Sequence, residues 1–229
     1  MQPLTSPGAG QIPGVPMQQP TNLFRFGETT LYSTFALINA NAVANSSNRL
    51  FSTPLGQQGQ GFAAGLTISL TNLKEGGRIP HGQAYDVYGV ACQIFGGADA
   101  TGATLATPFD TGAAGAGDVA NLQNVINNGI LRWDFTQTVV DICPVMLAGA
   151  GGGAFGAIAQ NAAAANSGSM GNGNGGIWMY RKHPVALPGS TTFGVLLDFG
   201  STAAVQPATT TTAVRVVLLG YYKSVIEIG

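Results

Sequence analysis

Charged residues are scarce in this sequence. Lys, Arg, Asp and Glu make up 8% of the 229 residues, against about 25% in an ordinary soluble domain. The first charged residue is Arg25, and none occurs between Ile142 and Tyr180. A soluble monomer relies on surface charge to keep its neighbours apart. The scarcity therefore favours a protein whose surface is shared with other subunits.

Long apolar runs are also missing. A membrane-spanning helix needs about 20 nearly uninterrupted apolar residues, and the best candidate, residues 139–153, is broken by Asp141, Pro144 and a glycine cluster. The N-terminal sequence MQPLTSPGAGQIPGVPMQQP lacks the basic start and apolar centre of a secretory signal. These absences predict a soluble, unprocessed chain.

A basic stretch is lacking as well. Lys and Arg number 9 against 10 Asp and Glu, for a formal net charge of -1, and no run would neutralise successive phosphates. We therefore expect no strong direct binding of nucleic acid. The densest basic run is Arg181 and Lys182. Two adjacent charges at a strand end are usually solvated, and an intersubunit contact or a patch facing anionic lipid is the alternative.

Only two cysteines are present, Cys92 in GVACQIF and Cys143 in VVDICPVM. Both lie in apolar, strand-like segments, where a small buried thiol is the usual state. Buried thiols are therefore the favoured interpretation, and a disulfide between Cys92 and Cys143 is the alternative. Neither spacing resembles a metal site.

Residues suited to catalysis are few. Nucleophilic catalysis needs a base beside a Ser or Cys, and the two histidines, His81 and His183, each adjoin a proline in the turn-like sequences IPHG and RKHP. Asp99, Asp110 and Asp118 lie in Gly-, Ala- and Thr-rich connections, where aspartate is typical of turns and caps. We therefore predict no catalytic residue and no enzymatic activity.

Binding motifs are weak in the same way. Gly151, Gly153 and Gly156 match G-x-G-x-x-G, but no acidic residue follows about 20 positions later to bind a ribose. No D-x-D-x-D-G array is present for calcium. Asn45-Ser-Ser is a glycosylation sequon that matters only in a secretory context. We expect neither a cofactor-binding site nor a metal site.

The first 22 residues differ in composition from the rest. Residues 1–22 hold five of the 12 prolines, with Gly, Gln, Ser and Thr. Such a segment cannot bury enough surface to fold alone and favours extended conformations. We predict an extended Pro-rich arm over residues 1–22 that contacts a neighbour, followed by a single domain over residues 23–229.

From Glu28 onward, short runs of β-branched and aromatic residues alternate with turn residues, the pattern of an all-β protein. Turns are predicted at Glu75-Gly-Gly and at Pro80-His-Gly, and a bend or break at Gly220 within the last strand. The predicted strands cover residues 29–39, 49–52, 62–73, 84–95, 130–135, 138–147, 177–181, 191–199 and 213–228.

One short helix is predicted at about 118–128. Asp118 can cap its N-terminus, apolar residues recur at helical spacing from Val119 to Ile126, and Gly129 suits a left-handed C-terminal position. One helix among many strands argues against a regular parallel α/β fold.

The segment 148–176 is dominated by Gly, Ala, Asn and Ser, with Phe155, Ile158 and Met170 as sizeable apolar anchors. Loops longer than about 15 residues are usually functional or packed against something. We predict a long Gly/Ala-rich surface or interface loop without a cofactor, and two turns of helix in AIAQNAAAAN are the alternative.

Five segments of the second half carry a resemblance. They are DVANLQNVINNG, followed directly by ILRWDFTQ, then VVDICPVML, LPGSTTFGVLLDFG and VRVVLLGYYKSVIEIG. In this order they resemble the coat proteins of tailless icosahedral bacterial viruses, whose jelly-roll subunits carry a short helix, a glycine and then a strand. The likeness is a pattern of elements rather than a signature of invariant chemistry.

The resemblance implies an eight-stranded, two-sheet sandwich that assembles with itself into trimers or other capsomers. It implies other virion proteins as partners, in some cases an internal membrane, and a virion location after assembly in the host cytoplasm. About nine or ten strand-like runs suit one jelly roll better than two. Residues 1–24 contain no Lys or Arg, unlike the basic arm of many coat proteins. An inner membrane or a second internal protein would account for that difference.

The leading hypothesis is an all-β, antiparallel single jelly roll that acts as a structural, self-assembling coat subunit of an icosahedral capsid. A decoration or spike-type protein of a virion or an envelope lattice would share the low charge and the β content. A ligand-binding β-sandwich is a further alternative. It is weakened because Trp133 and Trp178 lie in predicted strands rather than in loops.

Overall fold

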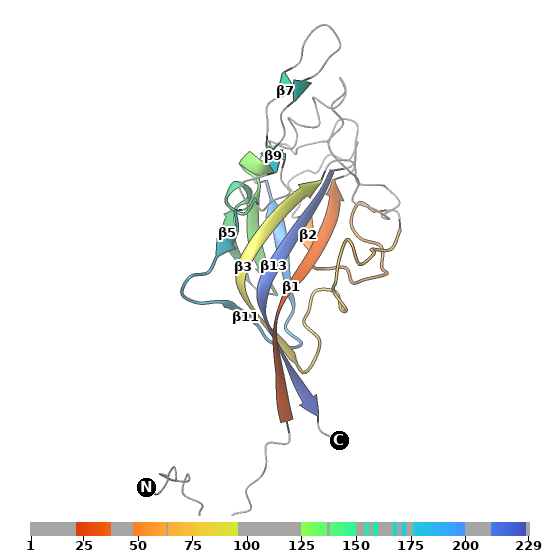
Figure 1. Ribbon diagram of the computed structural model, residues 1–229. Coiled ribbons are helices and arrows are strands. Elements are labelled where there is room, and N and C mark those ends of the chain that lie inside the picture. The colour runs from red at the N-terminus through yellow and green to blue at the C-terminus, as the bar shows by residue number, and fades with distance from the viewer. Residues whose placement is uncertain are drawn as a thin grey trace, which may run out of the picture.

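Strands dominate the computed structural model of the chain (Figure 1). It describes residues 22–37, 48–62, 64–95, 125–136, 138–149, 154–155, 158–159, 167–168, 171–172, 176–199 and 212–227. The main strands are β1 (Asn22–Leu37), β2 (Asn48–Leu50), β3 (Gln83–Phe95), β4 (Ile130–Phe135), β5 (Thr138–Pro144), β10 (Trp178–Met179), β11 (Val185–Leu187), β12 (Phe193–Asp198) and β13 (Thr212–Glu227). In this described part, no helix is long and apolar enough to cross a bilayer.

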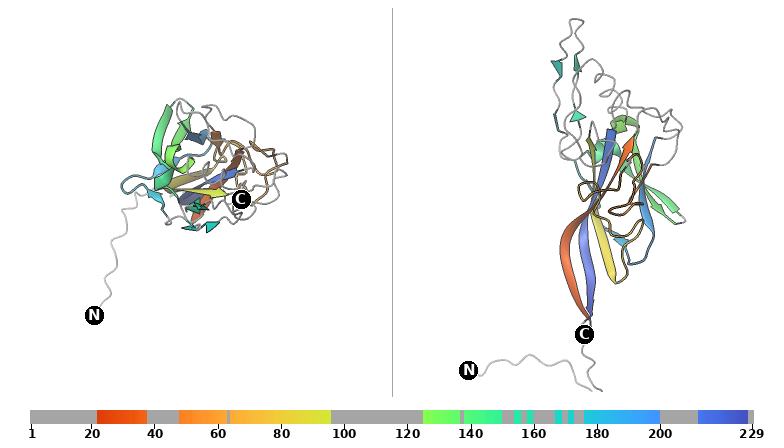
Figure 2. Two further views of the ribbon diagram at one scale, coloured as in Figure 1. Left: turned by 90° about the horizontal axis from the view of Figure 1, so that it is seen from above. Right: turned by 90° about the vertical axis from the view of Figure 1, so that its right-hand side faces the viewer.

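The strands form two antiparallel sheets that pack as a sandwich (Figure 2). Sheet A has the order β1-β13-β3-β10, with β11 also paired to β3, and sheet B has the order β2-β12-β4-β5. Val214, Val216 and Leu218 of β13 face Leu131 and Trp133 of β4 across the core, and none is more than 2% exposed. Every second residue points inward, as in sheets with one buried face. The predicted all-β class is therefore confirmed.

The pairing of strands is nested along the chain. β1 pairs with β13, β2 with β12, β3 with β10 and β11, and β4 with β5. Two further pairs, β13 with β3 and β12 with β4, complete the two sheets. The first strand thus lies beside the last, and the innermost pair, β4 and β5, forms a hairpin (Figure 1).

Most predicted strands are confirmed. β4 has the predicted bounds, and the ends of β3, β12 and β13 lie within two residues of the predicted ones. The predicted irregularity at Gly220 is confirmed, because the register between β13 and β3 shifts between Leu219 and Gly220. The run at 138–147 is shorter than predicted: β5 ends at Pro144, and Val145–Leu147 form a 3-10 helix, η1. The run at 177–181 shrinks to Trp178–Met179.

The strand predicted at 62–73 is wrong. That stretch consists of turns and irregular backbone, apart from an isolated bridge between Gln58 and Gly65. Gly61 has a φ of 80°, which turns the chain where a strand would continue straight. The apolar residues of the stretch form a small core of their own on sheet A, made of Phe62, Leu66 and Leu70 with Ala36 and Ala213.

The predicted helix is confirmed at its end. Residues 125–128 are helical, and its start at Asp118 lies outside the described residues. The left-handed conformation predicted for Gly129 is wrong, since its φ is not positive. Close packing requires glycine here instead. A Cβ at this position would lie 2.5 Å from the Val125 carbonyl oxygen and 2.8 Å from Cγ2 of Val145.

The segment 148–176 contains paired strands where a loop was predicted. β6 (Ala154–Phe155) pairs with β9 (Gly171–Asn172), and β7 (Ile158–Ala159) pairs with β8 (Ser167–Gly168), so the two ladders are nested. Ile158 and Ala159 therefore form a strand instead of the start of the alternative helix in AIAQNAAAAN. The anchoring roles of Phe155, Ile158 and Met170 remain predictions, because those side chains lie outside what the structure describes. Residues 1–21 lie outside it too, so the arm also remains a prediction.

Candidate contact surfaces and a pocket beside the first strand

Four large apolar side chains, two near each end of the charge-free stretch, are exposed to solvent. Between 40% and 55% of each is accessible. They form what we call the η1–β10 patch: Met146, Leu147, Ile177 and Met179. The Gly176 N–H donates to the Gly149 carbonyl at 3.0 Å, which holds the chain just after η1 against the start of β10.

The exposure of this patch follows from strand geometry. Trp178 packs toward the core, so its neighbours Ile177 and Met179 must point to the outer face. Both cover Gly89 of β3, where a Cβ would lie 3.0 Å from the Met179 sulfur and 3.1 Å from Cγ2 of Ile177. Because no charged residue occurs from Ile142 to Tyr180, an apolar partner could cover the patch without desolvating a charge of that stretch.

The outer face of sheet B carries paired charges beside two exposed apolar side chains, Ile130 and Val139. Arg49 of β2 pairs with Asp134 of β4 at 3.2 Å, and Arg132 of β4 contacts Asp141 at 2.6 Å and Asp198 at 2.8 Å. The hydrogen bond to Asp198, followed by the one to Asp141, raises the pKa of the Arg132 guanidinium. Water and salt screen such exposed pairs, so they contribute little stability. Their charges suit this face to water.

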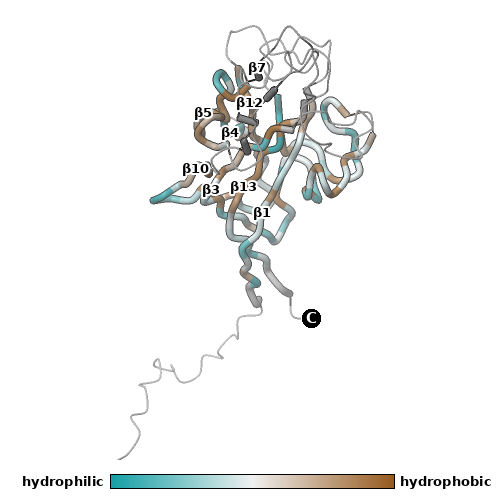
Figure 3. The backbone as a smooth tube through the Cα atoms, turned by 45° about the horizontal axis from the view of Figure 1, so that its top comes forward, coloured by the Kyte–Doolittle hydropathy of each residue, from teal (hydrophilic) through white to brown (hydrophobic). Residues whose placement is uncertain are grey.

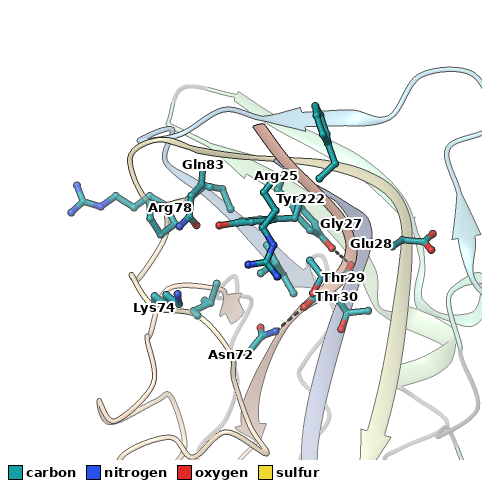
Figure 4. Close-up of a pocket in the computed structure, with 16 residues that line it drawn as sticks. Arg25, Gly27, Glu28, Thr29, Thr30, Asn72, Lys74, Arg78, Gln83 and Tyr222 are labelled. Atoms are coloured by element: carbon teal, nitrogen blue, oxygen red, sulfur yellow. Dashed lines mark hydrogen bonds between the residues drawn. The ribbon is translucent and has the colours of Figure 1, made fainter. Parts of the chain in front are cut away.

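A pocket of about 320 Å³ lies beside β1 (Figure 4). Leu73 and Ile79 are buried parts of its lining, whereas Arg25, Lys74 and Arg78 are exposed at its rim. Figure 4 shows the Arg25 side chain reaching between β1 and the segment that carries Lys74. The pocket therefore combines an apolar interior with a basic rim, a combination that suits a ligand with both apolar and anionic groups.

Tyr85 of β3 closes the inner wall of this pocket. Its hydroxyl lies 2.6 Å from the Thr29 carbonyl oxygen and 2.8 Å from that of Leu218. Burial raises the pKa of Tyr85 above its usual value, so the hydroxyl is a neutral donor. Gly220 leaves room for the ring, because a Cβ there would lie 2.7 Å from it.

The free edge of β1 is covered along its second half. The Tyr32 N–H donates to Oδ1 of Asn72 at 2.9 Å, and Nδ2 of Asn72 donates to the Thr30 carbonyl at 2.7 Å. Further along, the Ala36 N–H donates to the Gln60 carbonyl at 3.0 Å. The stretch wrongly predicted as a strand thus belongs to the segment that shields β1, an edge that would otherwise invite pairing with another chain.

Arg181 and Lys182 lie in an exposed segment between β10 and β11, where pairing with β3 is interrupted. Figure 3 shows a hydrophilic projection beside β10. His183 belongs to the same exposed segment, and His81 is exposed in the turn before β3. The structure therefore does not gather the histidines with either cysteine.

The other candidate residues lie outside the described ranges: Asn45, Asp99, Asp110, Asp118, Gly151, Gly153 and Gly156. Among the described residues, no group of three or more His, Cys, Asp or Glu is placed to hold a metal ion. Sequence reasoning missed the basic rim of the pocket. The only available signal was Arg25, the first charge after 24 uncharged residues.

Cys92 and Cys143 are buried and not bonded to each other, which confirms the favoured interpretation. Burial raises the pKa of each thiol to about 12, so the reactive thiolate is scarce at neutral pH. Trp133 is buried too: its Nε1 donates to the Tyr180 hydroxyl at 2.8 Å, and its ring stacks on Phe135. These side chains hold the two sheets together.

Comparisons with known proteins identify no relative. No protein-family profile matches the chain, and neither its sequence nor its structure matches any of the curated proteins or solved structures compared with it. Function is therefore inferred from the fold and surfaces of this chain alone.

Proposed function

We propose that this protein is a structural, self-assembling coat subunit of an icosahedral capsid, built as a single jelly roll. The strand order supports this fold. With β10 and β11 counted as one interrupted strand, eight main strands in chain order form sheets 1-8-3-6 and 2-7-4-5. Nested antiparallel pairing across two sheets is the arrangement of a jelly roll, an architecture that capsid domains share with lectins and cupins.

The η1–β10 patch is the observation that carries self-assembly. Fold alone does not imply function, so the choice among jelly-roll proteins depends on surfaces. The four exposed apolar side chains of the η1–β10 patch lie in a stretch without charge, whereas the outer face of sheet B carries paired charges. A subunit with one uncharged side for its neighbours and one charged face for water suits a shell.

The test compares a patch variant with a matched control. Leu147→Glu with Met179→Glu adds two charges inside the patch, and Leu55→Glu with Ile68→Glu adds two at exposed apolar positions elsewhere. We expect the unmodified protein and the control to form closed shells by light scattering and electron microscopy. The patch variant should stay small with unchanged circular dichroism.

Two outcomes would overturn the proposal. A stable 23.3 kDa monomer throughout the micromolar range would contradict a coat subunit. Binding to preformed shells without formation of its own would assign the protein to decoration instead.

A further inference from the structure

The pocket beside β1 lies where sheet A extends past sheet B. β1 and β13 contain 16 residues each, against six or seven in β4, β5 and β12. Figure 2 shows the ends of the two long strands running beyond the shorter ones. The inner face of sheet A therefore loses its covering sheet beside the first half of β1. Residues 72–80 flank this uncovered part and supply the opposite wall of the pocket.

Alternation along β1 places Arg25 on that inner face. Leu31 packs against the core. Because the register of β1 with β13 is unbroken, Thr29, Gly27 and Arg25 face the same side as Leu31. A cation thus lies where the strand pattern would place an apolar side chain. Gly27 leaves the space beside it open, since a Cβ there would meet nothing within 4 Å.

Hydrogen bonds fix the walls of the pocket to one another. The Tyr85 hydroxyl donates to the Thr29 carbonyl at 2.6 Å, so the inner wall is tied to β1. Nδ2 of Asn72 donates to the Thr30 carbonyl at 2.7 Å, which ties the segment 72–80 to the same strand. A pocket that is already formed binds its ligand without the cost of ordering its walls.

The interior of the pocket is apolar and has the size of a small molecule. Leu73 and Ile79 of its lining are buried, and Tyr222 packs partly against the core. The volume of about 320 Å³ lies at the lower end of ligand pockets, which measure about 300–1,000 Å³. At about 30 Å³ for each water-sized group, this volume holds about ten non-hydrogen atoms, as many as octanoate contains.

Two cations at the rim are available to a ligand. Within the described part of the chain, neither Arg25 nor Lys74 forms an ion pair, whereas Arg78 is paired with Glu75 at 2.5 Å. Glu28 is the acidic residue of the lining, and Figure 4 shows its carboxylate pointing away from Arg25. An anionic group is therefore the complement of this rim.

We propose that this pocket binds a small amphipathic anion, which carries a carboxylate or phosphate head group on an apolar chain. The head group lies between Arg25 and Lys74, and the chain lies against Leu73, Ile79 and Tyr222. A guanidinium binds either head group through paired N–H donors, and an ammonium adds a point charge. The inference is independent of the proposed function, because every residue of the pocket belongs to one chain.

The first experiment measures binding of octanoate and octyl phosphate to the full chain by ligand-observed NMR. We expect dissociation constants of about 0.1–10 mM, as ligands of this size reach, and the tighter of the two identifies the preferred head group. Octanol carries the chain alone and inorganic phosphate the head group alone, so each should bind at least about tenfold more weakly than its amphipathic counterpart. Octanol binding as tightly as octanoate, or phosphate as tightly as octyl phosphate, would overturn the proposal, and so would binding of neither anion.

A pair of double variants tests the basic rim. Arg25→Gln with Lys74→Gln removes both cations, and octanoate affinity should fall about tenfold, the combined effect of two ion pairs at a surface. Added salt should weaken binding to the unmodified chain for the same reason. Arg181→Gln with Lys182→Gln removes as much charge from an exposed segment outside the pocket and should leave affinity unchanged. Equal affinities of the two double variants would overturn the assignment of the head group to this rim.

A second pair of variants tests the cavity itself. Gly27→Leu adds an apolar side chain on the inner face, where a Cβ meets nothing, and leucine suits a strand better than glycine. We expect unchanged circular dichroism and a fall of about tenfold in octanoate affinity, because the side chain takes the place of the ligand's apolar chain. Gln57→Leu adds the same side chain at an exposed position outside the pocket and should keep full affinity. Full affinity in the Gly27→Leu chain would show that octanoate binds elsewhere and overturn the proposal.

Discussion

At the scale of single residues, Gly220 connects the pairing of β13 with the wall of the pocket. The register between β13 and β3 shifts at this position, and the ring of Tyr85 occupies the space that a side chain would fill. The Tyr85 hydroxyl then reaches carbonyl oxygens of β1 and β13. A glycine inside a β-branched run indicated the irregularity. Its cause, a tyrosine 135 residues earlier (220 minus 85), left no local signal.

Gly220→Ala should therefore destabilise the fold. Its Cβ would lie 2.5 Å from the Asp86 carbonyl oxygen and 2.7 Å from the Tyr85 ring, and such overpacking costs about 1–3 kcal/mol in the free energy of unfolding. Urea denaturation measures the change. Gly27→Ala is the matched control, because a Cβ there meets nothing within 4 Å. Equal losses for the two variants would show that crowding at Tyr85 is not the cause.

Burial of Cys92 makes stability depend on alkaline pH. The folded pKa is about 12, against an ordinary value of 9.0, so the folded state holds the thiol proton more tightly. Its contribution is complete below pH 9 and is lost as the pH rises from 9 toward 12, by up to about 1.4 kcal/mol per pH unit. Urea denaturation across this range should show the fall, with a shallower slope for Cys92→Ala. An identical slope in both proteins would assign the effect to other groups.

At the scale of elements, the segment between β2 and β3 protects an edge instead of adding a strand. Its sequence TISLTN has strand composition, which explains the wrong prediction at 62–73. The side chains of Thr71 and Asn72 instead form hydrogen bonds with the backbone of β1. The sequence did not predict β11, because its three residues lie between Pro184 and Pro188. Prolines in a sequence argue against a strand, although an edge strand tolerates them.

Asn72→Ala should weaken this protection. The variant leaves the Tyr32 N–H and the Thr30 carbonyl without the side-chain partners they have at 2.9 Å and 2.7 Å. We expect a loss of about 1–3 kcal/mol in the free energy of unfolding, and faster aggregation on warming through the exposed edge. Urea denaturation and turbidity measure the two effects. Gln57→Ala, at an exposed position of the same segment, should change neither.

The pocket shows why a site can escape sequence analysis even when its strands do not. β4 was predictable because ILRWDF alternates between buried and outward-facing positions. The pocket instead joins β1 to residues 72–80 and to Tyr222, which meet only through long-range register. The charges of Arg25 and Lys74 become one rim only after folding.

At the scale of the whole molecule, the uncharged patch and the charged face of sheet B predict how association responds to conditions. Contact between apolar surfaces is driven by entropy near room temperature, so association should strengthen on warming from about 5 to 25 °C. Surface ion pairs would instead weaken with salt. We expect light scattering to rise with temperature and to change less than about twofold between 50 and 500 mM NaCl. Dissociation by salt alone would assign the main contact to charged groups.

The nested pairing also determines when sheet A can form during synthesis. Asn22 pairs with Glu227, and β13 lies between β1 and β3 in sheet A, so sheet A cannot close until the ribosome has made β13. Such long-range closure is slow, because the entropy of a large loop is lost before the contacts that offset it form. Until β13 has been synthesised, β1 and β3 lack the strand that lies between them in sheet A. At high expression, when many unfinished chains meet, each could take the missing strand from another, and chaperone supply would then limit the yield of correctly folded subunits.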